Sequence, residues 1–114
     1  MSQIKIEEQI GGMIVHLKGQ FTGGEETDEL RTTLQDIAKQ QKNVLILNLE
    51  KCTYLNSTAL GVLIAAHANF SKRDGKIILC NVSKSIENIF VITKLSLVFT
   101  LTDTLDEAIK KISE

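Results

Sequence analysis

The fold is decided by Leu45-Ile-Leu-Asn-Leu-Glu-Lys-Cys-Thr-Tyr-Leu-Asn-Ser-Thr-Ala-Leu-Gly-Val-Leu-Ile64. Residues 43–49 are almost wholly apolar, which predicts a central strand that is buried on both faces and covered by helices. A short polar loop follows, and Ser57 and Thr58 then open an apolar helix. The unpaired N–H groups and the dipole at a helix N-terminus favour an anion. Ser57 is therefore either a helix cap or a hydroxyl that carries a phosphate.

Two strands and a helix are predicted before this stretch. Residues 3–9 and 13–18 alternate apolar and polar side chains, and Gly11-Gly12 between them is typical of a hairpin turn. Residues 20–24 contain two glycines and read as a loop. Apolar residues at helical spacing then predict a helix over 25–40.

After the quoted stretch, strands and helices alternate to the end of the chain. The pattern predicts a helix over 57–72, a strand over 76–80, a short helix capped by Ser83 or Ser85, and a strand over 97–101. Thr104 and Glu107 have capping-box spacing and open a last amphipathic helix. We therefore predict one α/β domain over 1–114, with a mixed sheet, an N-terminal antiparallel hairpin and about four helices packed on it.

Composition excludes several classes of function. The chain has 114 residues, is 43% hydrophobic and has a net charge of −1, which gives no electrostatic case for nucleic acid or an anionic membrane. No apolar run approaches the roughly 20 residues of a membrane span, and no apolar signal-peptide core opens the chain. We expect a cytoplasmic monomer with no metal or cofactor, in which Cys52 and Cys80 are buried free thiols.

The sequence holds no catalytic set. Ser57 lacks the GxSxG elbow of serine hydrolases, and His67 lies ten residues further along the same helix, roughly 15 Å away by helix rise. His16 lies on a predicted strand, and no phosphate-binding glycine loop is present. We expect that the protein is not an enzyme. Two interpretations of the helix start remain. In the first, Asn56 or Ser57 is simply an N-cap. In the second, Ser57 is reversibly phosphorylated.

Three motifs resemble the anti-sigma-factor antagonists of the STAS-domain family, over nearly the whole chain. They are Leu17-Lys-Gly-Gln-Phe21, Leu47-Asn-Leu-Glu50 and, above all, Tyr54-Leu-Asn-Ser-Thr-Ala-Leu-Gly61. The family pattern at the third motif is Asp-Ser-Ser/Thr-Gly-Leu-Gly, in which the first hydroxyl after the acid is the phosphoacceptor. By this resemblance the acceptor is Ser57, and Thr58 is the second hydroxyl.

The resemblance implies a partner-switching module of bacterial signal transduction and transcription regulation. The unphosphorylated domain would bind an anti-sigma factor that is also a serine kinase, and would so release the sigma factor. Phosphorylation of Ser57 by that kinase, with its ATP and Mg²⁺, would break the complex, and a serine phosphatase would reset it.

The chain departs from the family pattern at three positions. Asn56 replaces the usual Asp, Ala59 replaces the usual Gly, and Thr22 stands near the place of another common Asp. Asn keeps the capping ability of Asp but loses a charge that could pair with a basic residue of the kinase. Ala59 favours helix over Gly by about 1 kcal/mol, and we expect it to stiffen the loop and to crowd a close partner.

The expected docking surface combines the loops over residues 20–24 and 52–57 with the exposed side of the helix over 57–72. Tyr54 is either an exposed anchor or packs on the core with its hydroxyl at the surface. Lys72 and Arg73 form either a partner contact or a solvated helix end. The expected partner-binding residues are Thr22, Gly23, Gly24, Tyr54, Asn56, Thr58, Ala59, Asn69, Lys72 and Arg73.

Two other functions compete with the phosphoswitch. Some proteins of the family are small partners of membrane transporters or subunits of larger signalling assemblies, and the neutral Asn56 and Thr22 favour such a non-switching binding subunit. An enzyme or nucleotide-binding protein is disfavoured, because no phosphate loop or base accompanies Ser57.

Overall fold

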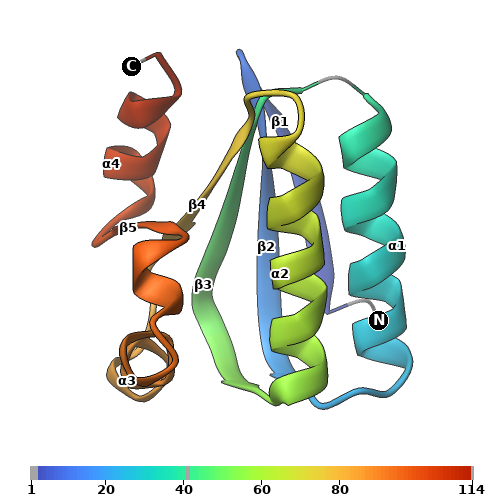
Figure 1. The fold of residues 1–114 in the computed structure, drawn as a ribbon, viewed down its shortest axis with the longest axis vertical. Coiled ribbons are helices and arrows are strands. Elements are labelled where there is room, and N and C mark those ends of the chain that lie inside the picture. Colours follow the sequence, from blue (N-terminus) through green and yellow to red (C-terminus); the bar gives the residue numbers. More distant parts are fainter. Residues whose placement is uncertain (1–2, 41, 114) are drawn as a thin grey trace.

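A computed structural model describes residues 3–40 and 42–113 (Figure 1). A single five-stranded sheet has the order β1-β2-β3-β4-β5, in which β1 and β2 form an antiparallel hairpin and all later neighbours are parallel. This confirms the predicted mixed sheet with an N-terminal hairpin. The strands are β1 (Ile4–Gln9), β2 (Gly12–Phe21), β3 (Val44–Leu55), β4 (Lys76–Cys80) and β5 (Thr100–Thr102).

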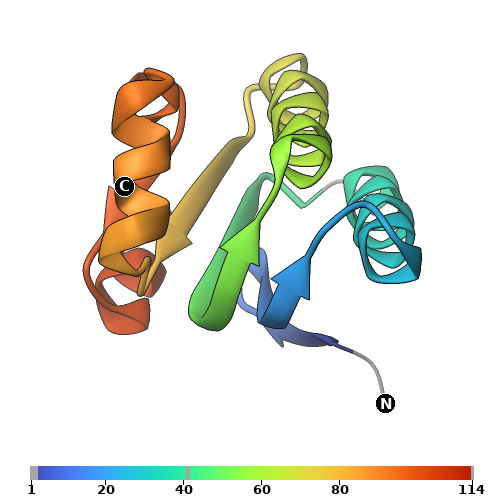
Figure 2. The same ribbon diagram turned by 90° about the horizontal axis from the view of Figure 1, so that it is seen from below.

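Four α-helices cover the two faces of the sheet, as predicted (Figure 2). The helices α1, α2 and α3 contribute to the larger apolar cluster on one side, here called the front face, and α4 packs on the other side, the back face. The helices are α1 (Glu25–Lys39), α2 (Ser57–Ser71), α3 (Lys84–Ile92) and α4 (Leu105–Lys110), with short 3₁₀ turns η1 (Leu95–Leu97) and η2 (Lys111–Ser113).

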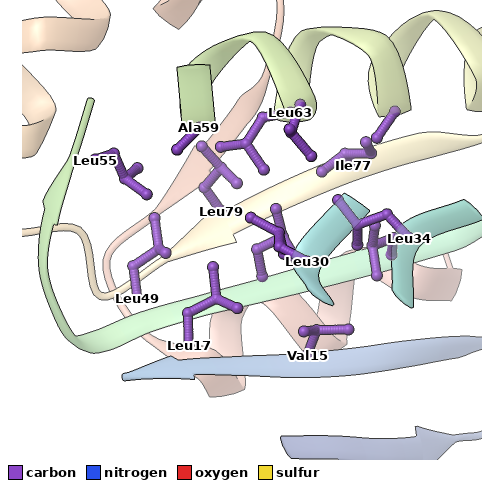
Figure 3. Packing of buried hydrophobic residues seen from close by; sticks show 14 of the residues in the cluster. Val15, Leu17, Leu30, Leu34, Leu49, Leu55, Ala59, Leu63, Ile77 and Leu79 are labelled. Atoms are coloured by element: carbon purple, nitrogen blue, oxygen red, sulfur yellow. The ribbon is translucent and has the colours of Figure 1, made fainter. Parts of the chain in front are cut away.

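The front-face core is a continuous layer of apolar side chains between the sheet and α1 and α2. Figure 3 shows Leu30 and Leu34 of α1 and Leu63 of α2 pointing toward the side chains of the sheet. The first four residues of β2 and every residue of β3 from Val44 to Leu49 are buried, so β3 is central and covered on both faces, as its composition predicts. Burial of this apolar area is the main favourable contribution to folding.

The back face is apolar under α4 and polar beyond it. Ile14, Ile46 and Ile78 pack against α4, but the next residues of β2 and β3 on this same face are His16 and Asn48. Asn48 is one of two buried polar residues in the described part of the chain. This polar half of the back face borders an open cleft of about 490 Å³.

The polar back-face residues form one chain of hydrogen bonds. Asn48 Nδ2 lies 3.0 Å from His16 Nδ1, and His16 Nε2 lies 2.9 Å from Glu7 Oε1. Asn48 Oδ1 accepts from Asn81 Nδ2 at 2.9 Å and from the N–H of Glu50 at 3.2 Å. Because these donors, together with Cys80 Sγ at 3.8 Å, fix Asn48 Oδ1 as the acceptor, its Nδ2 must donate to His16, which leaves the imidazole proton on Nε2 facing Glu7.

The predicted helix caps are present. Ser83 Oγ accepts the N–H of Ile86 at 3.3 Å, and Thr104 and Glu107 form both bonds of the capping box. After α2 the left-handed residue is Asp74, with φ +60°, and not the following Gly75. Gly75 is required by space, because a Cβ there would lie 2.8 Å from the carbonyl oxygen of Asn43.

Strand boundaries differ from the prediction in four places. Residues 20–21 continue β2 and residues 50–55 continue β3, although both segments were predicted as loops. The two extensions pair with each other, with two bulges, because Phe21 and Leu55 place their side chains in the core. The last strand is only Thr100–Thr102, since residues 95–97 form the 3₁₀ turn η1, and the hairpin turn is Ile10-Gly11 with Gly12 already in β2.

Both cysteines are buried free thiols, as predicted. Burial raises the pKa of the Cys52 thiol to about 11, and burial together with the nearby charge of Glu50 raises the pKa of Cys80 to about 11. Both thiols are therefore protonated and unreactive in the folded protein at neutral pH.

Within residues 3–40 and 42–113, none of the helices is long and apolar enough to cross a bilayer. Over the same ranges, no group of three or more His, Cys, Asp or Glu side chains is arranged to hold a metal ion.

Candidate functional site

The predicted acceptor lies on a tight corner between β3 and α2. Asn56 alone joins the end of the strand to the start of the helix. Its side-chain Oδ1 accepts the N–H of Ala59 at 3.0 Å, and its own N–H donates to the carbonyl of Phe21 at 3.0 Å. Of the two capping residues that the sequence allows, the cap is therefore Asn56.

Ser57 is the first helical residue after the cap and is exposed. Its hydroxyl makes no hydrogen bond to any residue in the described part of the chain. The first turn of α2 contains no acidic side chain, so the positive end of its dipole is not compensated from within the helix. A phosphate on Ser57 would supply the missing negative charge at this helix end.

The loop over residues 22–24 lies against this corner, as the docking-surface prediction requires. Gly23 adopts φ +93°, and a Cβ built on it would lie 3.6 Å from Thr58 Cβ and 3.7 Å from Asn56 Nδ2. Even a methyl-sized side chain at Gly23 would therefore reach van der Waals distance of both residues beside the acceptor, so the loop lies close to the corner. Thr22, Gly23 and Gly24 are all exposed, so the loop and the corner form one continuous surface.

Glu26 is a member of this surface that the sequence analysis missed. Its Oε1 accepts from the N–H of Thr22 at 3.1 Å and from the Thr22 hydroxyl at 3.0 Å, and its Oε2 accepts the N–H of Thr27 at 2.8 Å. The backbone N–H groups of Thr22 and Thr27 hold the pKa of the Glu26 carboxyl below its usual range. Glu26 belongs to this surface only through its contact with the 22–24 loop, which the sequence does not reveal. The one feature of the sequence that could have drawn attention to Glu26 is the acidic first turn of the helix.

A groove between α1 and α2 begins beside the acceptor. It has a volume of about 430 Å³. The residues of α2 at its floor, Gly61 and Ala65, are exposed and have small side chains or none. A Cβ on Gly61 would meet no atom within 4 Å. The groove is lined by Arg31, Leu34, Gln35, Thr58, Gly61, Val62, Ala65, Ala66 and Asn69. Thr58 and Asn69 were predicted docking residues, and the structure places them in one groove.

The other four predicted docking residues differ in exposure and in their distance from the acceptor. Tyr54 is 46% exposed, which favours the exposed anchor over the core-packed alternative. Ala59 is fully buried in the front-face core (Figure 3), so the expectation that its methyl group crowds a partner is wrong. Lys72 and Arg73 follow the C-terminal end of α2, about 22 Å from Ser57 by helix rise, and are not part of the acceptor surface.

Arg73 is neither a solvated helix end nor a contact near the acceptor. Its guanidinium stacks on Phe70, with Cζ 4.5 Å from the ring centroid. Its Nε and Nη2 are buried and have no hydrogen-bond partner among the described residues. Lys72, in contrast, is exposed, in agreement with a solvated helix end.

Neither histidine is placed to act on Ser57. His67 lies within hydrogen-bond distance of Ser71 and packs edge-on against Phe99, while His16 belongs to the hydrogen-bonded chain on the back face. An exposed hydroxyl at an uncompensated helix N-terminus can receive a phosphoryl group, but it has no nearby base with which to attack a substrate.

Comparisons with known proteins agree with this fold. Residues 3–108 match the family model of the STAS domain. The anti-sigma F factor antagonist of Paenibacillus polymyxa is 22% identical over 102 residues, which cover 89% of this chain and 86% of that protein.

Two groups of solved structures share the fold. The anti-sigma factor antagonist SpoIIAA of Bacillus in its unphosphorylated form superimposes with a TM-score of 0.79 at 18% identity, over 96% of this chain and 97% of that one. A sulfate transporter family protein of Wolinella succinogenes gives a TM-score of 0.80 at 20% identity, over 92% and 87% of the two chains.

Proposed function

Because this chain belongs to the STAS-domain family, we propose that it is an anti-sigma-factor antagonist that works by partner switching. In its unphosphorylated form it binds an anti-sigma factor that is also a serine kinase, and the sigma factor is released. Transfer of a phosphoryl group to Ser57 ends the complex, and a serine phosphatase restores the binding form. The relationship to the anti-sigma F factor antagonist supports the first half of this cycle.

The observation that carries the proposal is the free hydroxyl of Ser57. Asn56 caps α2, so the Ser57 hydroxyl is exposed and is not needed to hold the helix. A phosphate there adds close to two negative charges on the surface that a partner would cover. SpoIIAA, which shares the fold, is known in both an unphosphorylated and a phosphorylated form.

The docking surface is the acceptor corner, the 22–24 loop and the groove between α1 and α2. The groove floor at Gly61 and Ala65 is open enough to receive an apolar side chain of the partner. Charged contacts at the rim would set the rate and selectivity of association more than the affinity itself. The protein supplies the hydroxyl and the surface, whereas the kinase supplies ATP, Mg²⁺ and the catalytic groups, so we propose that this chain is not an enzyme.

The test is phosphorylation and binding with purified anti-sigma-factor kinases of the source organism. We expect one added phosphate, mapped to Ser57 by mass spectrometry, and a loss of kinase binding after its addition. Ser57→Ala should bind like the wild type, and Ser57→Asp should bind at least tenfold more weakly. Ser85→Asp is the matched control, because Ser85 is an exposed serine in the first turn of α3.

The proposal fails if the phosphate is found only on another residue, or if Ser57→Asp and Ser57→Ala bind equally well. Intact binding without phosphorylation would instead describe a constitutive antagonist.

A non-switching subunit of a transporter or of a larger signalling assembly is the second candidate. The neutral side chains of Thr22 and Asn56 favour it, as does the shared fold of the Wolinella succinogenes transporter protein. Co-purification with transport components, and not with a kinase, would support this function.

A further inference from the structure

We propose that Glu26 positions the loop over residues 22–24 against the acceptor corner and that its negative charge opposes a phosphate on Ser57. Phosphorylation would then loosen this loop as well as change the charge of the corner. The inference rests on the proposed phosphorylation of Ser57 and names a second residue through which that event alters the docking surface.

The loop is held from α1 at two consecutive residues. Glu26 accepts both the N–H and the hydroxyl of Thr22, and Thr27 Oγ1 accepts the N–H of Gly23 at 2.9 Å. Thr27 is fully buried, so its hydroxyl is a fixed anchor for Gly23. Glu26 is only partly buried, and its two bonds to Thr22 are therefore the part of this attachment that a nearby charge can disturb.

The same loop is in contact with the acceptor corner. Gly23 lies so close to Thr58 and Asn56, the two residues that flank Ser57, that a Cβ on it would be in van der Waals contact with both. The backbone bond from Asn56 N–H to the Phe21 carbonyl ties the two segments together immediately before the loop. A change at Ser57 is therefore transmitted over one layer of contacts to the residues that Glu26 holds.

The electrostatics of the two helix starts differ. The first turn of α1 contains Glu25, Glu26 and Asp28, whereas the first turn of α2 contains no acid. Figure 1 shows that the two helices begin at the same end of the molecule, so a phosphate on Ser57 would stand at the same end as the acidic start of α1. Glu26 remains ionised because two backbone N–H groups lower its carboxyl pKa. Like charges within about one Debye length repel each other, and salt weakens the effect.

The sequence departure at Thr22 is consistent with this role. By the family resemblance, an acid is common near that position, and in this chain the Glu26 carboxylate lies directly on Thr22 instead. Glu26, which belongs to α1, therefore places a negative charge beside this loop.

Amide hydrogen exchange of the isolated protein tests the proposal without any partner. Ser57→Glu places a carboxylate at the acceptor and is compared with the wild type in three backgrounds: unchanged, Glu26→Gln and Glu25→Gln. Glu25 is the matched control, because it is an exposed glutamate in the same helical turn whose carboxylate makes no hydrogen bond or ion pair with the described residues. Ser57→Asp serves as a second mimic if Ser57→Glu folds poorly.

We expect Ser57→Glu to accelerate exchange at the Thr22 and Gly23 amides at least fivefold in the unchanged and Glu25→Gln backgrounds. In the Glu26→Gln background the acceleration should be less than twofold, and 1 M NaCl should reduce it in every background. Equal acceleration in all three backgrounds, no acceleration in the unchanged one, or an effect that salt leaves unaltered would overturn the proposal. Because no kinase takes part, this outcome is independent of whether the partner-switching experiment succeeds.

Discussion

The side-chain oxygen of Asn56 accepts the backbone N–H of Ala59 at 3.0 Å, and this bond leaves the hydroxyl of Ser57 free. In many helix starts the serine itself would make that bond. Here the residue before the serine caps the helix, so the helix keeps its cap whether or not the serine is modified. The division of roles between two adjacent residues has a direct mutational consequence.

Asn56→Ala should lower the free energy of unfolding by about 1 kcal/mol, because the N–H of Ala59 loses its acceptor. Asn56→Asp should lose less than about half of that, since aspartate caps equally well and its charge suits the helix dipole. Urea denaturation measures both. Asn88→Ala, at an exposed position of α3, is the control and should change little. Equal losses for the Asp and Ala variants at Asn56 would contradict the capping role.

Gly61→Ala should stabilise the protein by up to about 1 kcal/mol, because alanine favours helix over glycine and its Cβ meets no atom. Gly61→Leu should keep the fold but fill the groove between α1 and α2, and we expect at least tenfold weaker binding of the anti-sigma factor in calorimetry. Ala68→Leu, on an exposed part of α2 outside the groove, is the control. If Gly61→Leu binds as tightly as Ala68→Leu, the groove is not part of the docking surface.

Asn48→Ala should cost about 2–4 kcal/mol of stability. It removes the acceptor for Asn81 and for the N–H of Glu50 and the donor for His16, and polar groups left unpaired near the core each cost roughly 1–3 kcal/mol. The measurement is chemical denaturation, and Asn43→Ala on the surface before β3 is the control. A loss below about 1 kcal/mol would show that water replaces the missing partners.

The two thiols make stability depend on pH in the alkaline range. Each thiol has its folded pKa raised from 9.0 to about 11, so folding favours the protonated form. The contribution is fully present below pH 9 and is lost as the pH rises from about 9 to 11. The free energy of unfolding should therefore fall less steeply over that range in a Cys52→Ala, Cys80→Ala double variant than in the wild type. Parallel curves would contradict this account.

Much of the fold follows from local sequence patterns. The apolar run of β3 predicts a central strand, and the spacing of Thr104 and Glu107 predicts the capping box, because both signals depend on neighbours in the chain. The extension of β3 through Leu55 was missed, because Glu50, Lys51 and Thr53 give this segment the composition of a loop. Its strand conformation comes from pairing with the end of β2, a contact between distant parts of the sequence.

The candidate site, like the fold, could be predicted from the sequence only in part. Ser57 stands out from the sequence because a hydroxyl pair opens an apolar helix, and the exposure of Ser57 agrees with that reading. The burial of Ala59 and the attachment of Glu26 to Thr22 could not be predicted, because each depends on how α1 and α2 are placed on the sheet. The separation of Lys72 and Arg73 from Ser57, in contrast, follows from helix rise alone, because both residues come just after the end of α2.

The single-residue joint between β3 and α2 also determines what kind of enzyme can act on Ser57. A serine on a long loop could extend into a deep catalytic cleft, but this serine is anchored within one residue of a central strand and is the first residue of a packed helix. Bringing its hydroxyl into such a cleft would require unfolding the first turn of α2 and withdrawing Ala59 from the core. Under the proposed function, the kinase and the phosphatase would therefore need a shallow active site that accepts a folded, convex corner, and short peptides copied from residues 52–62 should be poor substrates for both.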